Sequence, residues 1–411
     1  MISRVWKTRL AATLTCSSIF VYGQFAHAGD FLRDLFSTRS DCVQLTARQE
    51  VLFVTRDART DTGNVVSGPD ADLLNFDNSD FDPPTGYRIG VGFQTPVHKV
   101  ELLFAEYGTW FSRNTGSLST GLSFDGAIPG SWAAGSNTLT QNTFFAPIFA
   151  AATADAEEAE GLGPNLAFAD TAPTYVQYYQ SQMQDFEVNW TSNDPAADIR
   201  VGIGYRNVQL DETAGLQITG LFRATDLGGG ANGGLSDGSL TGAGLTFSTN
   251  TANGFDDESP LGNNGAPDQL TLAYTAQTSN QLNGFQAIVD ACLIDGERFE
   301  LTLIGKAGAY HNHATGNVQE QYSGIGNDVS RYGRSFRDTK DSVAFIGGVA
   351  AKGRFRMSRR TSLYAGYEGT FVSGVALSPE QANGIRGSVY EVDTDGNIIV
   401  HGANLGVEFV Y

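Results

Sequence analysis

Segments in which apolar and polar residues alternate recur along the whole chain. In residues 86–94, aromatic and branched side chains occupy the odd positions, and arginine, glycine and glutamine occupy the even ones. Because successive side chains of a strand point to opposite faces, this pattern predicts a strand with one apolar face. It predicts ten strands in all, over residues 43–56, 86–94, 98–112, 175–191, 198–222, 270–294, 297–311, 341–357, 361–374 and 401–411.

The last of these segments ends the chain on an aromatic ring. Leu405, Val407, Phe409 and Tyr411 share one face of the strand. Outer-membrane barrels end in this way, with the apolar face toward lipid, although the edge strand of a soluble sheet could look the same. We therefore treat these four residues as a candidate assembly signal, and expect outer-membrane lipid and the barrel-assembly machinery as partners.

The connections between the ten segments are long and short in strict alternation. Long connections fall at residues 57–85, 113–174, 223–269, 312–340 and 375–400, and short ones at 95–97, 192–197, 295–296 and 358–360. In an up-and-down barrel every second connection lies on the same rim, and membrane barrels have short periplasmic turns and long extracellular loops. The pattern predicts an all-β fold, namely a single up-and-down antiparallel transmembrane β-barrel of ten strands over residues 43–411. A soluble secreted β protein, the alternative, gives no reason for this alternation.

Two segments shift the phase of their alternation. In 198–222 the apolar residues move from odd to even positions near Val208, and 270–294 mirrors the shift near Gln281. A bulge or a fresh strand would explain each shift. The simplest interpretation is one long hairpin whose tip stands above the membrane, and twelve strands are the alternative.

The N-terminus has the features of a secretory signal. Residues 1–28 combine a basic start, an apolar run at 10–22 and the sequence Ala26-His27-Ala28, a typical cleavage site. The apolar run is short for an N-terminal membrane anchor, which would need about 20 residues. We predict export to the outer membrane of a diderm bacterium after cleavage, with residues 29–42 as a periplasmic leader.

The mature chain keeps two cysteines, Cys42 and Cys292. In an oxidising compartment such a pair can form a disulfide, but only if the leader folds back across the mouth of the barrel. The third cysteine, Cys16, follows Thr15, where a lipoprotein signal requires a small residue such as glycine or alanine.

Composition agrees with a barrel. Glycine is abundant, with 49 residues, phenylalanine and tyrosine contribute 26 and 15, and only 17% of residues are charged. The net charge of −19 argues against nucleic acid as a partner, because phosphate binding requires clustered basic residues.

Several stretches resemble a family of outer-membrane β-barrel porins of planctomycete bacteria. They are NQLNGFQ at 280–286, GKAGAYHN at 305–312, SLYAGYEGTFVSGVALSPEQ at 362–381, the ending HGANLGVEFVY, and IGYRNVQLDE at 203–212. The resemblance covers roughly the C-terminal third to half of the chain. It implies the fold and the location, and hardly anything about activity, because its motifs are strand patterns.

Charged residues on the polar strand faces are expected to line the lumen. They could form a charged constriction that selects small solutes. They could instead form a salt-bridged plug, because side chains already fill the interior of an eight-stranded barrel, and ten strands enclose little more space. We predict a narrow porin-like pore or a structural surface protein, with no enzymatic activity, cofactor or metal. The candidate lumen residues are Arg200, Arg206, Arg298, Lys306, Lys352, Arg354, Arg356, Glu187, Glu368 and Glu408, with Asp185 and Glu300 beside them.

Two further kinds of site are weighed against this prediction. His311, His313 and His401 fall near the extracellular rim, which would suit a hydrolase that acts at the rim, but no G-x-S-x-G motif accompanies them. The turn 393–397 has some features of a loop that binds divalent cations, but it lacks the ligand spacing of an EF-hand. Solvation of the acidic loops is the simpler role.

Overall fold

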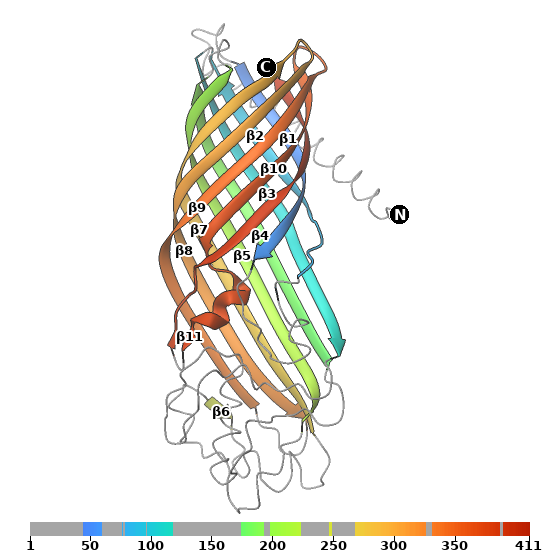
Figure 1. Ribbon diagram of the computed structural model, residues 1–411, viewed down its shortest axis with the longest axis vertical. Helices are drawn as coiled ribbons and strands as arrows, with labels where there is room; N and C mark the ends of the chain where they lie inside the picture. The colour runs from blue at the N-terminus through green and yellow to red at the C-terminus, as the bar shows by residue number, and fades with distance from the viewer. Residues whose placement is uncertain are drawn as a thin grey trace, which may run out of the picture.

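The computed structural model describes residues 44–59, 76, 79–95, 97–117, 174–192, 198–222, 246–248, 268–325, 331–386 and 389–411. Ten long strands wrap into a barrel (Figure 1). They are β1 (Gln44–Arg59), β2 (Thr85–Gln94), β3 (His98–Ser117), β4 (Thr174–Ser192), β5 (Ile199–Phe222), β7 (Asp268–Asp295), β8 (Phe299–Ile325), β9 (Arg331–Arg356), β10 (Thr361–Val375) and β13 (Gly396–Val410).

The barrel is closed and antiparallel. Each strand pairs with its neighbours in chain order, and β13 pairs with β1 from Thr46↔Val410 to Arg59↔Asn397. The prediction of a single up-and-down barrel with ten strands is confirmed, and the alternative of twelve strands is wrong. A short strand, β6 (Thr246–Ser248), pairs with β9 in addition. No helix among the described residues is long and apolar enough to cross a membrane.

The two ends of the barrel differ. At one end, the short-turn end, brief turns such as 296–298 and 357–360 join the strands, and the chain ends there (Figure 1, top). The longer connections gather at the other end, the long-loop end. The predicted signal peptide, 1–28, and leader, 29–42, lie outside the described residues.

The strands are unequal in length. β5, β7, β8 and β9 have 24 to 28 residues, whereas β1, β10 and β13 have 15 or 16. The predicted 29-residue loop at 312–340 is therefore wrong, since only residues 326–330 separate β8 from β9. Polar residues there continue the backbone ladder, which does not depend on apolar side chains.

The phase shift in β5 is not a bulge. Its even-numbered side chains face the interior from Arg200 to Ile218, and it pairs with β4 and β7 without a register shift. Near the short-turn end the outward side chains are apolar, with Ile203 59% exposed, and the inward ones are polar, as at Arg206. Toward the long-loop end the roles are exchanged, so that Leu216 is buried inside while Gln217 is exposed. The shift marks the height at which the outer surface changes from apolar to polar.

The barrel thus has two halves with opposite interiors. The short-turn half has an apolar outer surface and a polar lumen, and the long-loop half has a polar outer surface and an apolar core. Trp110, Tyr179 and Tyr274 are among the largest fully buried side chains of this core. A bulge at Gly108, where φ is +78°, places Trp110 on the inward face, because Gly adopts positive φ without steric cost.

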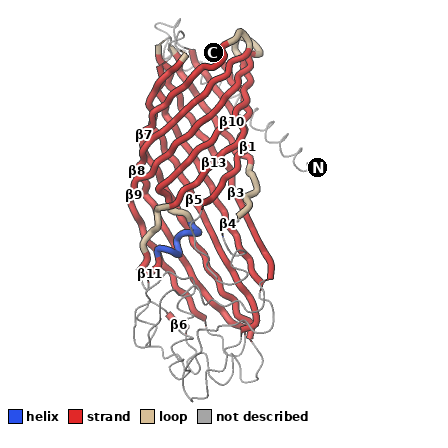
Figure 2. The backbone as a smooth tube through the Cα atoms, viewed as in Figure 1, coloured by secondary structure: helices blue, strands red, loops and turns tan. Residues whose placement is uncertain are grey.

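Residues 376–386 and 389–395, from the connection between β10 and β13, fold against the interior of the long-loop half, and we call them the plug segment. They contain the 3₁₀ helix η5 (Ser378–Gly384) and the paired short strands β11 (Ile385–Arg386) and β12 (Val389–Tyr390). The helix, blue in Figure 2, lies where the short strands end and contacts β5, β7 and β8. The plug segment therefore covers the interior where the wall formed by β10, β13 and β1 is short.

Candidate functional site: a charged chamber and its plug

The lumen of the short-turn half contains a polar cavity of about 330 Å³, which we call the chamber. All ten barrel strands contribute to its lining, through the residues near their short-turn ends. Nine basic and seven acidic side chains line it. The alternation of the strands explains the concentration of charge, because every second residue of this half must face the lumen.

Nine of the ten predicted lumen residues line the chamber. They are Arg200, Arg206, Lys306, Lys352, Arg354, Arg356, Glu187, Glu368 and Glu408. The tenth, Arg298, does not: it is exposed in the turn between β7 and β8, because β8 begins only at Phe299. The prediction for Arg298 is wrong because side chains alternate between two faces only within a strand, and not in a turn. Of the two charges predicted beside them, Glu300 lines the chamber, while Asp185 is buried without lining it.

The first three strands supply further charges to the lumen, beyond the predicted residues. These are Arg48 and Glu50 of β1, Arg88 of β2, and Lys99 and Glu101 of β3. In β2 and β3 these charges lie on the polar side of the alternation, so the sequence contained the signal there.

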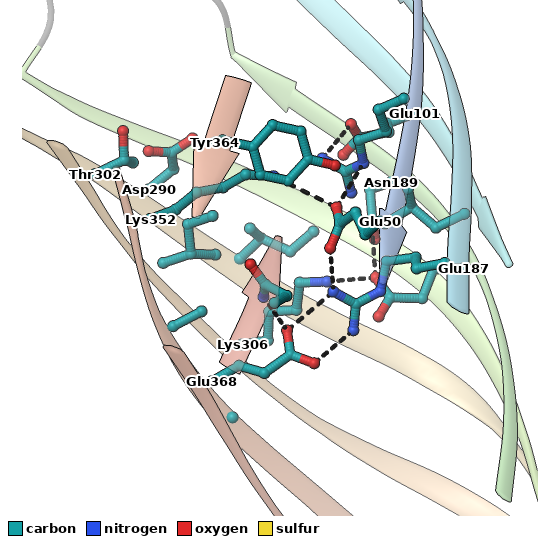
Figure 3. Close-up of a pocket in the computed structure, with 18 of the residues that line it drawn as sticks. Glu50, Glu101, Glu187, Asn189, Asp290, Thr302, Lys306, Lys352, Tyr364 and Glu368 are labelled. Atoms are coloured by element: carbon teal, nitrogen blue, oxygen red, sulfur yellow. Dashed lines mark hydrogen bonds and ion pairs between the residues drawn. The ribbon is translucent and has the colours of Figure 1, made fainter. Parts of the chain in front are cut away.

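A network around Glu50 crosses the chamber (Figure 3). This carboxylate is buried, and its Oε2 atom accepts a hydrogen bond of 3.0 Å from Arg88. Arg88 also donates to Glu368, with distances of 2.7 and 2.9 Å. Arg48 lies 3.3 Å from Glu50 and 3.0 Å from Glu101. The network connects β1, β2, β3 and β10 across the lumen.

A second network lies on β4, β5 and β8. Arg206 donates from Nε and from Nη2 to Asp185, the shortest distance being 2.7 Å, and lies 3.5 Å from Glu187. Glu187 also accepts a hydrogen bond from Lys306. In both networks each buried carboxylate is paired with a cation within hydrogen-bond distance. This pairing offsets the cost of removing the charges from water.

The plug segment is attached to the opposite wall by buried polar contacts. The side chain of Asn280 on β7 accepts a hydrogen bond of 2.7 Å from the backbone N–H of Ala376 and donates one of 2.8 Å to its carbonyl oxygen. The backbone N–H of Ser378 donates to Glu212 of β5 at 3.0 Å. Glu212 also forms an ion pair with Arg56 of β1, and both side chains are fully buried.

The histidines face outward and not toward the chamber. His313 Nδ1 lies 2.8 Å from Asp341 on β9, and His311 lies 3.5 Å from the same carboxylate. The hydrogen bond from His313 holds the pKa of Asp341 below its usual range. His401, three strands away, interacts with the hydroxyl of Tyr367 at 2.7 Å. These histidines thus lie on the outer surface and do not contribute to the chamber.

The four residues of the candidate assembly signal all lie on the outer surface. Leu405 and Tyr411 are exposed, and Val407 and Phe409 are partly buried between β1 and β10. In the turn 393–397, the backbone N–H of Asp395 donates to the side chain of Asp393, as in an ordinary turn. Cys292 lies on β7, but Cys42 lies outside the described residues, so the disulfide stays a prediction.

No model of a known protein family matches the chain, and no curated protein does. Among solved structures, the chain is similar to the outer membrane protease OmpT from Escherichia coli, with 8% identity and a TM-score of 0.33 over 90% of this chain and 97% of that chain. It is also similar to a FadL homologue of Pseudomonas aeruginosa, with 11% identity and a TM-score of 0.25 over 90% of each chain. For the toluene transporter TodX of P. putida the values are 9% and 0.19 over 91% of each chain. Likenesses this distant carry no argument, so the barrel rests on its own strand pairing, and the resemblance to planctomycete porins stays a prediction.

Proposed function

We infer that this protein is an integral outer-membrane β-barrel with a closed lumen, which presents long loops at the cell surface. Membrane insertion is supported by the band of exposed apolar side chains around the short-turn half. Exposure of so large an apolar surface to water would be unfavourable, whereas contact with lipid would remove this cost. Members of the band include Ile89, Leu102, Trp190, Val201, Phe285, Val349, Leu363 and Leu405.

The length of the strands supports an outer half that stands above the bilayer. A membrane strand needs only about 9–11 residues, and β5, β7, β8 and β9 have more than twice as many. Their outward residues are polar in the long-loop half, as expected in water. The short turns then face the periplasm and the long loops the exterior. The proposal includes outer-membrane lipid and the barrel-assembly machinery as partners. It also includes membership of the planctomycete porin family.

The observation that carries closure is the packed interior of the long-loop half. Trp110 of β3, Tyr179 of β4 and Leu377 of the plug segment are each 0% exposed. A ten-stranded barrel is only slightly wider than one that side chains fill completely. A path for solutes through this half would require the plug segment to leave.

A narrow pore is the second candidate, and the polar chamber favours it. In this case displacement of the plug segment would open the way from the chamber to the exterior. The rim hydrolase has less support, since its histidines face away from the chamber.

Two measurements on the refolded full chain test the proposal. Co-flotation with lipid vesicles should show insertion, and a chain that stays with the soluble fraction would contradict the membrane assignment. Single-channel recordings in a planar bilayer should show no steady conductance, because the interior is packed. Steady conductance of the unmodified protein would show an open pore and refute closure.

A further inference from the structure

The charge of the chamber is opposite in sign to that of the whole chain. The chain has 26 basic and 45 acidic residues, yet nine basic and seven acidic side chains line the chamber. Asp185, which hydrogen-bonds Arg206 without lining the chamber, still leaves an excess of one positive charge. A third of the basic residues of an acidic protein thus surround a single small cavity.

Among the cations of the Glu50 network, Lys352 is the one whose charge is balanced least by a nearby carboxylate. Its ammonium lies 3.5 Å from Glu50, a carboxylate that already interacts with Arg88 at 3.0 Å and Arg48 at 3.3 Å. The ammonium also lies 3.6 Å from the centre of the Tyr364 ring, a favourable but neutral contact. A partly buried cation that shares one carboxylate with two arginines retains a favourable position for another anion.

Arg200 shows the same deficit at another place in the lining. It makes no ion pair with any described residue, and its Nε atom is buried without a hydrogen-bond partner. Asp290 is its register partner on β7, but the two side chains do not form an ion pair. A guanidinium carries five N–H donors, and its fork geometry matches two oxygens of one anion.

We propose that the chamber binds a compact oxyanion, a phosphate or a short dicarboxylate, which enters from the short-turn side and is attracted by the incompletely neutralised charges of Lys352 and Arg200. The inference deepens the proposed function, since it names the class of solute that a closed barrel takes up. A cation would meet a net positive lining in which most carboxylates are already engaged. The volume of about 330 Å³ is enough for such an anion with part of its hydration shell.

Calorimetric titration of the refolded full chain in detergent micelles tests the proposal, with sodium phosphate, sodium succinate and calcium chloride as separate probes. We expect binding of at least one oxyanion and no comparable binding of calcium. Lys352→Met and Arg200→Gln should each weaken oxyanion binding by about tenfold or more, because each removes a charge-assisted contact. Lys352→Met is expected to fold, since Glu50 keeps both arginines.

Arg359→Gln is the matched control, because Arg359 is exposed in the turn between β9 and β10 and does not line the chamber. Circular dichroism and heat-dependent gel migration verify that each variant is folded. Binding of phosphate alone or of succinate alone supports the proposal and identifies the oxyanion. Equal affinity of Lys352→Met and Arg359→Gln, preference for calcium, or no oxyanion binding by the folded unmodified chain would overturn it. The titration needs no bilayer and no conduction, so its failure is distinguishable from failure of insertion or closure.

Discussion

Replacement of Asn280 by leucine should release the plug segment. Asn280 is fully buried, and its amide makes two hydrogen bonds with the backbone of Ala376, of 2.7 and 2.8 Å. Its oxygen also accepts a bond of 3.0 Å from Asn312. Leucine has a similar volume and fills the space, but it leaves the N–H and the carbonyl of Ala376 without their partner.

The expected cost follows from these unpaired groups. A buried backbone group that loses its partner costs about 1–3 kcal/mol, so two of them cost about 2–6 kcal/mol, offset in part by the apolar gain of leucine. A net destabilisation of about 3 kcal/mol would raise the population of the detached plug segment roughly a hundredfold, because 1.4 kcal/mol is a factor of ten.

Hydrogen exchange followed by mass spectrometry in micelles measures this population. Amides of the plug segment should exchange roughly a hundredfold faster in Asn280→Leu than in the unmodified chain, while those of β13 keep their protection. The control is Gln281→Leu, the next residue on β7, whose side chain is exposed on the outer surface. Equal protection of the plug segment in the two variants would refute the conclusion that Asn280 holds it in place.

The remaining predictions concern the wall and the chamber. A spin label at Ile203 should be accessible to oxygen dissolved in lipid, and one at Gln217 to a water-soluble relaxation agent, because the outer surface changes character between them; identical accessibility would contradict two halves. Arg206→Met should lower the free energy of unfolding by about 3–5 kcal/mol in urea titrations, since its carboxylate partners stay buried without it. A loss under 1 kcal/mol would show that the network is solvated. Replacement of Phe409 and Tyr411 by serine should leave the protein unfolded in the periplasm, and normal assembly in membrane fractions would rule out the terminal strand as assembly signal.

The sequence was sufficient to predict the strands of the short-turn half and their number. There, one face must be apolar for lipid and the other polar for the lumen, so alternation is strong in β2, β5 and β13. The first strand was predicted too, over residues 43–56, but its lumen charges were not, because Arg48 and Glu50 share the inward face with Leu52 and Val54. The inward face changes from polar to apolar within four residues, and no single period of hydropathy describes it.

The strand ends and the plug segment were also beyond prediction. Residues 312–325 are largely polar, which predicts a loop, although they pair with β9 as far as Ser323↔Arg331. Leu377 and Val392 lie in what reads as a turn-rich connection, yet both are fully buried. Their burial depends on a concave wall built by β5, β7 and β8, which are distant in sequence.

The contacts of Glu212 connect three parts of the chain that are synthesised at different times. This carboxylate of the middle strand β5 meets Arg56 from the first strand, the hydroxyl of Tyr179 at 2.9 Å, and the backbone N–H of Ser378, which precedes the last strand. A buried carboxylate without these donors would be strongly unfavourable. The charge is therefore satisfied only when both chain ends have arrived, so a barrel whose seam is unfinished retains a local energetic penalty, and completion of the circle removes it.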